Sequence, residues 1–194
     1  EALFAIGGNM LLARTGAMYH DVGKIKNPFF FTENQHGKYN LHDEMSYYES
    51  SQIIINHVAD GIEICRKYHV PEQIIDFVRT HHGTRRTEYF YQMELKENPA
   101  EEVNEADFRY HGPIPFSKET AVLMMADSVE AASRSLSDKT EESISKLVDG
   151  IIDAQVKDNQ FINTDLTFRD VTVIKKVFKK KLMNIYHVRI AYPV

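Results

Sequence analysis

Apolar residues recur at every third or fourth position over most of this chain, which is the spacing of amphipathic helices. The longest stripe predicts a helix that is capped by Ser50 or Ser51 and runs to about Tyr68. Its apolar positions are Ile54, Val58, Ile62 and Cys65. His57 and Gly61 fall on the same side. A titratable ring therefore lies on the face that this helix is expected to bury.

Five further segments have the helical period. Residues 10–19 present small side chains that let a neighbouring helix approach closely, and Gly23 is the stop signal after them. Pro71 opens the next helix and Gly83 ends it. The remaining helices are expected over residues 118–136, 141–157 and 168–186. Strand alternation is weak throughout, so we expect an all-α fold built as a single helical domain.

Two stretches lack this period. Residues 26–41 are rich in Phe, Asn, Gly and Lys and predict a long loop, a type of segment that is often functional. Residues 84–116 predict an irregular insertion. Its first part, "EYFYQMELKEN", can be helical, and its acidic, proline-containing second part is expected at the surface. The lysines of "KKVFKKK", residues 175–181, are interpreted as the solvated face of the last helix.

The composition limits the classes of protein to which this chain can belong. The chain has 194 residues and 43% hydrophobic residues, enough for one compact domain with a core. A formal net charge of −5 argues against a nucleic-acid polymer as partner. The single Cys65 excludes an intramolecular disulfide and a zinc site built from cysteines. The chain begins without methionine, in the helix-like stretch "EALFAIGGN", and we interpret it as a soluble piece of a longer protein.

Histidines and aspartates mark candidate chemistry at four places. They are His20–Asp21, His57, His81–His82 and Asp127, each at a predicted helix end or beside an apolar stripe. A buried carboxylate is costly unless it is paired or binds a metal. Imidazole and carboxylate together suit iron, manganese or zinc.

Three of these places also have a purely structural interpretation. His57 alone is also explained as a core histidine with a hydrogen-bond partner. Asp127 alone is also explained as a buried, hydrogen-bonded aspartate. His81–His82 is also explained as a polar helix end beside Gly83. The joint occurrence of all six potential ligands in this order favours the metal site.

A second His–Asp pair, His42–Asp43, is assigned to structure, because Asp43 lies where a helix begins and no Gly-Lys follows the pair. The remaining histidines are expected at the surface, in loops or at helix ends. They are His36, His69, His111 and His187.

The chain resembles the HD-domain phosphohydrolase superfamily through "HDVGK", His57, "HHG" and "MMADSVEAASRSL". It is more closely similar to the catalytic domain of the bacterial seven-transmembrane HD family, which degrades cyclic di-AMP. The supporting segments include "GGNMLLARTGAMYHDVGKIKNPFFFTENQ", "FRYHGPIPFSKETAV", "LTFRDV" and "IYHVRIAYP". They extend over nearly the whole chain. The fold that this resemblance implies is the HD-domain helical bundle.

The resemblance implies a two-metal phosphodiesterase in which Asp21 bridges the metals, with iron or manganese expected and zinc as the alternative. By the same resemblance, His57, His81 and His82 complete the ligand set of one metal. His20 and Asp127 hold the other together with one further histidine on a preceding helix. That histidine is not in this sequence, so residues 1–194 are expected to be an HD phosphohydrolase domain whose first ligand helix is truncated.

The implied chemistry is attack by a metal-activated hydroxide on a phosphodiester. Lys24 is expected to contact a phosphate oxygen, with a solvated helix-end lysine as the alternative. Arg134 is a further candidate phosphate contact. Asn34 or Gln35 can read a base edge, beside the phenylalanines of "PFFFTENQ", which offer stacking faces or fill the core.

The expected reaction is hydrolysis of cyclic di-AMP to linear pApA. Another HD reaction, on a nucleotide or a deoxynucleoside triphosphate, is the first alternative, and a nucleotide-binding signalling module without turnover is the second. Cyclic di-GMP is disfavoured, because no "GYP" follows "HHG". By resemblance, the full-length protein is expected to be membrane-anchored, with this domain on the cytoplasmic side and homodimerisation as a further option.

Overall fold

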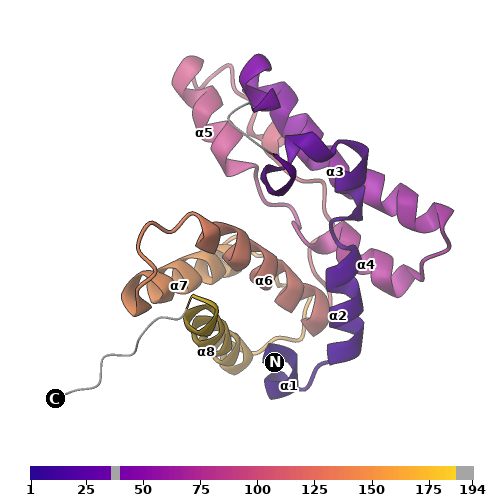
Figure 1. Ribbon diagram of the computed structural model, residues 1–194, viewed down its shortest axis with the longest axis vertical. Helices are drawn as coiled ribbons and strands as arrows, with labels where there is room; N and C mark the ends of the chain where they lie inside the picture. The colour runs from indigo at the N-terminus through magenta and orange to yellow at the C-terminus, as the bar shows by residue number, and fades with distance from the viewer. Residues whose placement is uncertain (36–39, 187–194) are drawn as a thin grey trace. The chain divides into compact units, whose positions relative to one another are not determined.

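The computed structural model describes residues 1–35 and 40–186, and these are helical without a strand. Eight α-helices are present in the described ranges, and Figure 1 labels them. They are α1 (Ala2–Ile6), α2 (Met10–Tyr19), α3 (Tyr47–Lys67), α4 (Glu72–Thr80), α5 (Glu88–Glu97), α6 (Lys118–Arg134), α7 (Glu141–Lys157) and α8 (Phe168–Ile185). Short 3₁₀ helices are η1 (Val22–Lys26), η2 (Pro28–Phe30), η3 (Thr32–Asn34), η4 (Leu41–Glu44) and η5 (Glu105–Phe108). The all-α prediction is confirmed.

The four longest helices begin at a serine or threonine that caps the first turn. In each case the cap hydroxyl accepts a hydrogen bond from the backbone N–H three residues on, and that residue's side chain accepts one from the cap's N–H. The caps are Ser46, Ser117, Thr140 and Thr167. A cap of this kind contributes about 1 kcal/mol by satisfying an otherwise unpaired donor.

The predicted cap of α3 at Ser50 or Ser51 is wrong. The helix begins four residues earlier than Ser51, at Tyr47, because Ser46 and Glu49 form the reciprocal capping pair. Ser50 and Ser51 are buried within the helix, and Ser51 shares a hydrogen bond of 2.7 Å with Thr87.

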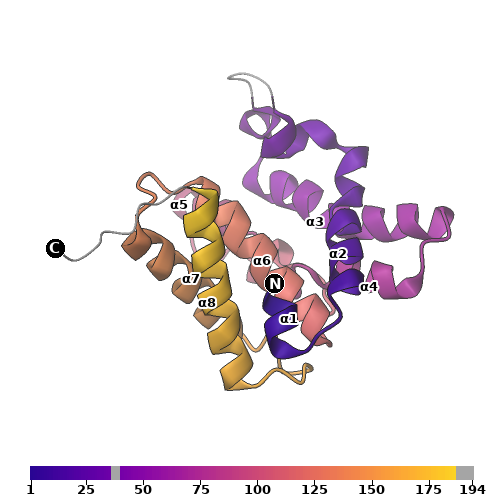
Figure 2. The ribbon, with the colours of Figure 1, turned by 60° about the horizontal axis from the view of Figure 1, so that its bottom comes forward.

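The chain groups into two compact units, which are described separately. The first comprises Glu1–Arg14 and Ile114–Val194. In it α6, α7 and α8 pack against one another, and α1 contacts α6 and α8 (Figures 1 and 2). The fully buried core residues of this unit include Ala121, Met124, Met125, Ile144, Val148, Ile152 and Ile174.

The lysines of α8 are not a uniformly solvated face as predicted. Lys175 lies 2.5 Å from Asp153 and Lys179 lies 2.6 Å from Asp149, so both connect α8 to α7. The side chain of Lys175 is only 18% exposed.

The second unit, Thr15–Pro113, is organised around α3. Helices α4 and α5 and the short η1 and η5 all contact α3. Its buried cluster contains Cys65, Ile75 and Val78. The predicted loop over residues 26–41 consists largely of 3₁₀ turns, and residues 36–39, including His36, lie outside the described residues. His187 also lies outside them.

The irregular insertion folds back on itself. The Thr87 amide donates to the Phe108 carbonyl at 2.8 Å, and the Tyr110 amide donates to the Arg85 carbonyl at 2.8 Å. These bonds bring the two ends of the 84–116 segment side by side around α5 and η5. Among the described residues, no helix is both long and apolar enough to cross a bilayer.

A close backbone contact joins η1 to α3. A Cβ atom on Gly23 would lie 1.8 Å from the His57 carbonyl oxygen and 2.5 Å from the Gly61 amide nitrogen. A Cβ on Gly61 would lie 2.8 Å from a methyl carbon of Val78 and 3.2 Å from the Gly23 nitrogen. Glycine at both positions is what lets the segment that follows His20–Asp21 lie directly on α3.

We predict that Gly23→Ala lowers the free energy of unfolding by about 3 kcal/mol or more, because the added methyl meets backbone that cannot rotate away. Chemical denaturation measures the change. Gly150→Ala is the matched control, since nothing lies within 4 Å of a Cβ there on α7. It should stabilise the protein by about 0.5–1 kcal/mol. Equal effects of the two substitutions would contradict the close-contact interpretation.

Candidate metal centre

Three histidines of the second unit meet at one point. His57 comes from α3, and His81 and His82 follow the last turn of α4. One ring nitrogen of each lies within 4.8 Å of those of the other two. The Nε2 atoms of His57 and His81 are 3.1 Å apart. His57 is 2% exposed and His81 is fully buried, so water does not solvate these nitrogens as it would at a surface.

A backbone carbonyl three residues earlier holds the ring of each anchored histidine. The Nδ1–H of His57 donates to the Ile54 carbonyl at 2.5 Å, and that of His81 donates to the Val78 carbonyl at 2.8 Å. His20 uses the same arrangement with the Ala17 carbonyl at 2.9 Å. Because a carbonyl can only accept, Nδ1 carries the proton and Nε2 of a neutral ring carries the lone pair.

This arrangement fits a divalent metal. The Nε2 atoms of His57 and His81 face each other at 3.1 Å, and a proton or a metal cation between two such atoms removes the repulsion of their lone pairs. The Asp21 Oδ1 atom lies 3.5 Å from both Nε2 atoms, which adds a carboxylate ligand beside them. Imidazole and carboxylate donors with carbonyls behind them are the usual surroundings of such ions.

The ionisation states suit metal binding. Burial, followed by the charge of neighbouring His81, lowers the pKa of His57 to about 4. Burial and then the charges of His81 and His57 hold the pKa of His82 well below its usual range. Both rings are therefore neutral near pH 7, the form in which imidazole binds a metal.

Asp21 is held as a carboxylate. Burial alone would raise its pKa, but the polar contacts with His20 and His81 and the positive charge of Lys24 hold the pKa well below its usual range. Asp21 directly precedes η1, which lies against α3 through Gly23. His20 Nε2 lies 3.3 Å from the second carboxylate oxygen, Oδ2. The structure thus brings together His20, Asp21, His57, His81 and His82.

Tyr110 is a residue of the site that sequence reasoning missed. Its ring stacks on His82 with centroids 4.2 Å apart and planes at 24°. The hydrogen bond from its backbone to Arg85 fixes it there. The contact joins residues far apart in the sequence within an irregular segment, so no periodic signal marked it.

Lys24 lies between two carboxylates. Its Nζ atom is 2.8 Å from Asp21 Oδ2 and 2.6 Å from Glu33 Oε1, and it lies 5.0 Å from the centre of the Phe31 ring. Burial would lower the pKa of Lys24, but Asp21 and Glu33 raise it. The alternative of a simply solvated lysine is wrong, because the side chain is 20% exposed and doubly paired. Its contact with a phosphate stays a prediction.

The other predicted substrate contacts have varied surroundings. The Gln35 amide nitrogen donates to the Phe29 carbonyl at 3.1 Å and to Asn40 at 3.0 Å, so it connects parts of its own loop. Asn34 is half-buried at the end of η3. Asp127 and Arg134 lie on α6 of the first unit, and Arg134 pairs with Glu130 at 2.8 Å. The roles of all four stay predictions.

The second His–Asp pair has the structural surroundings that were predicted. His42 Nε2 donates to the Phe30 carbonyl at 2.9 Å, and its ring packs against Phe30 and Phe90. Asp43 lies in the first turn of η4.

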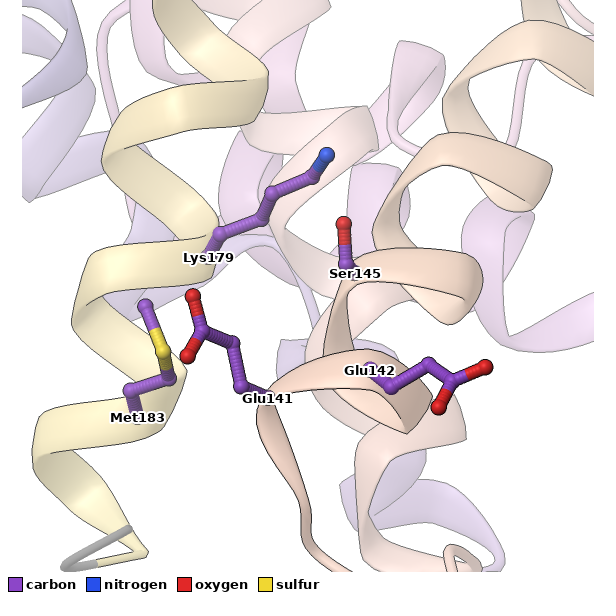
Figure 3. A pocket seen from close by; sticks show the side chains of 5 residues that line it. All are labelled: Glu141, Glu142, Ser145, Lys179 and Met183. Atoms are coloured by element: carbon purple, nitrogen blue, oxygen red, sulfur yellow. The ribbon is translucent and has the colours of Figure 1, made fainter. Parts of the chain in front are cut away.

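Of two hollows in the described residues, one adjoins the histidine cluster and the other lies in the first unit. One of about 210 Å³ adjoins His82 and Tyr110 and has an apolar wall from α3. The other, about 420 Å³, lies in the first unit between α7 and α8, and Figure 3 shows it. There Glu141 lies beside Met183, and Lys179 is already paired with Asp149. The described residues that line this second hollow include no imidazole.

The fold and this cluster define an all-α domain built around clustered histidines and an aspartate. The HD domain family model matches residues 3–132, and the chain belongs to the HD-domain family.

Its relatives include proteins named cyclic-di-AMP phosphodiesterase PgpH. The chain is 46% identical over 189 residues to that of Bacillus subtilis (strain 168) and 44% identical over 188 residues to that of Listeria monocytogenes serotype 1/2a (strain 10403S). Each match covers 97% of this chain and 26% of the relative, so the chain spans about a quarter of their length.

Two crystal structures of the PgpH HD domain from L. monocytogenes are also similar, each at 42% identity. One has a TM-score of 0.89 and covers 96% of this chain and 86% of that one. The other, in complex with cyclic-di-AMP, has a TM-score of 0.92 and covers 95% and 86%.

We predict that His81→Ala greatly weakens binding of divalent metal. Loss of an outer hydrogen-bond partner costs roughly 10–100-fold in affinity, and loss of a direct ligand should cost more. Metal analysis of the purified protein and a competition titration measure the effect. His69→Asn is the control, because His69 is exposed and has a positive φ of 56°, which asparagine tolerates. Unchanged metal affinity in His81→Ala would contradict the assignment.

Proposed function

We propose that this domain hydrolyses a cyclic dinucleotide, cyclic di-AMP, to linear pApA with the help of bound divalent metals. One observation carries the proposal: the Nε2 atoms of His57 and His81 face each other at 3.1 Å beside the Asp21 carboxylate. Two relatives are named as cyclic-di-AMP phosphodiesterases, and one similar crystal structure contains cyclic-di-AMP, which supports the choice of substrate.

The proposed ligands divide between two metals. His57, His81 and His82 would hold one, His20 and Asp127 would contribute to the other, and Asp21 would be shared. Iron or manganese suits these donors, with zinc as the alternative. Such metals, when bound, lower the pKa of water and neutralise charge on phosphate oxygens.

The chain's own residues prepare the site for this reaction. The three anchored imidazoles keep their Nε2 atoms directed inward without further rearrangement. The Lys24 ammonium supplies positive charge for a non-bridging phosphate oxygen, and Arg134 is the second proposed phosphate contact. Asn34 is a better candidate than Gln35 for reading a base edge, since the Gln35 amide nitrogen already has two partners.

Two further possibilities belong to the proposal as alternatives. Another HD reaction, on a nucleotide or a deoxynucleoside triphosphate, would use the same ligands. A signalling module that binds the nucleotide without turnover would use the same proposed substrate contacts. The placement at the cytoplasmic side of the membrane within a longer protein, and a homodimeric state, rest on the family resemblance.

We predict that Asp21→Asn lowers turnover of cyclic di-AMP by about 10³-fold or more, because the neutral amide cannot serve as the shared anionic ligand. Product analysis in metal-replete buffer measures turnover. Asp60→Asn is the matched control. Asp60 forms an ion pair of 2.9 Å with Lys26, which lies on the same short helix as Lys24, and Asp60 itself is outside the histidine cluster. It should keep wild-type activity.

Substrate profiling separates the alternatives. Full turnover by Asp21→Asn would contradict the metal-dependent reaction. Hydrolysis of mononucleotides without hydrolysis of cyclic di-AMP would favour the other HD reactions. Calorimetric binding of cyclic di-AMP without any product would favour the signalling module.

A further inference from the structure

Glu33 is the one acid in the "ENQ" segment, and its carboxylate contacts the ammonium of Lys24. The Oε1 atom lies 2.6 Å from Lys24 Nζ, across nine positions of sequence. Lys24 in turn lies 2.8 Å from Asp21 Oδ2. One lysine therefore connects the shared carboxylate of the metal centre to a second carboxylate outside it.

The geometry restricts the ammonium from three sides. A lysine has three N–H donors, and two of them meet Asp21 and Glu33. The Phe31 ring lies 5.0 Å from Nζ and adds a favourable cation–π contact. The third N–H is then the one that can meet a phosphate oxygen.

The loop that carries Glu33 is itself connected. Glu33 lies in η3, where the Asn34 amide donates to the Phe31 carbonyl at 2.9 Å. The Gln35 side chain donates to the Phe29 carbonyl and to Asn40. These hydrogen bonds span the position of Glu33 and hold its backbone. The Glu33 carboxylate therefore contacts Lys24 from a turn that is stabilised by its own hydrogen bonds.

We infer that Glu33 is a positioning residue, which acts on the reaction by holding the Lys24 ammonium in place for a phosphate oxygen. This inference rests on the proposed function for the identity of the substrate. The contact between Glu33 and Lys24 itself does not.

Two physical effects follow from the second carboxylate. It balances the lysine charge, so that Asp21 does not carry the full attraction of Lys24 and keeps its negative charge for the histidine side of the cluster. It also removes rotational freedom from a long side chain before the substrate arrives, so less entropy is lost on binding. Neither effect requires Glu33 to touch the substrate.

A double-mutant cycle tests the inference. The variants are Glu33→Gln, Lys24→Ala and the two combined, each assayed for kcat and KM on cyclic di-AMP. Glu33→Gln should lower kcat/KM about tenfold, within the range for residues that share one hydrogen-bond network. In the Lys24→Ala background the same substitution should change kcat/KM by less than about twofold. Equal losses in both backgrounds would overturn the inference, because a loop-structural role does not depend on Lys24.

The matched control is Glu63→Gln. Glu63 Oε2 lies 2.6 Å from Lys26 Nζ, so this variant removes the same kind of pair from the same short helix, two residues along. It should leave kcat/KM unchanged. A loss as large as that of Glu33→Gln would show that any acid–lysine pair on η1 suffices, which would also overturn the inference.

A second measurement does not depend on turnover. The nitrogen-15 resonance of the Lys24 ammonium, assigned by its absence in Lys24→Ala, should be sharp in the wild type because two carboxylates hold the group. It should broaden or vanish in Glu33→Gln and stay unchanged in Glu63→Gln. An unaffected resonance in Glu33→Gln contradicts the positioning role. Absence of cyclic di-AMP turnover in the wild type contradicts the proposed function instead, and the resonance still decides the role of Glu33.

Discussion

The candidate metal centre depends on a close backbone contact that includes none of the proposed ligand atoms. Gly23 lies so close to α3 that a single added methyl would overlap the His57 carbonyl oxygen. This approach brings the end of α2 and the start of η1 against the helix that carries His57. Asp21 then lies within 3.5 Å of two imidazole nitrogens that come from other elements. Side-chain chemistry at this site follows from backbone packing, which only glycine allows here.

The charges of the site form a consistent set. His57 and His82 are neutral near pH 7, the Nδ1 protons of His57 and His81 are directed to carbonyls, and the Asp21 carboxylate beside them stays ionised with the help of Lys24. Each group alone would be costly to bury, and together they form the donor set that a divalent cation requires. Glu33 lies outside this donor set and is connected to it through Lys24, which pairs with both Glu33 and Asp21.

Much of the fold was predictable because it follows from local signals. The predicted ranges of α2 and α7 agree with the structure, since the apolar period and the helix-end residues are clear there. The start of α3 was not predictable in the same way, because Ser46 and Glu49 precede the apolar stripe and Ser50 and Ser51 lie nearer to it. The stripe shows which face is buried but does not show where the helix begins.

The site was predictable in its ligands and less so in their supports. The histidines and Asp21 were found from residue type, spacing and family resemblance, and the structure of the second unit brings His20, Asp21, His57, His81 and His82 together. Glu33 and Tyr110 were missed because each acts through a contact between distant, irregular segments, which leave no period in the sequence. Asp127 and Arg134 stay predictions, since they belong to the other unit.

The stack of Tyr110 on His82 has a consequence for how the domain can be altered. The aromatic ring arrives on the returning arm of an irregular excursion of about thirty residues, whose two ends are joined by backbone hydrogen bonds. Such excursions are commonly treated as exchangeable decoration when homologous domains are aligned or minimised. Here the excursion supplies a wall of the metal centre. A shortened version that kept every ligand would leave one imidazole without its aromatic support.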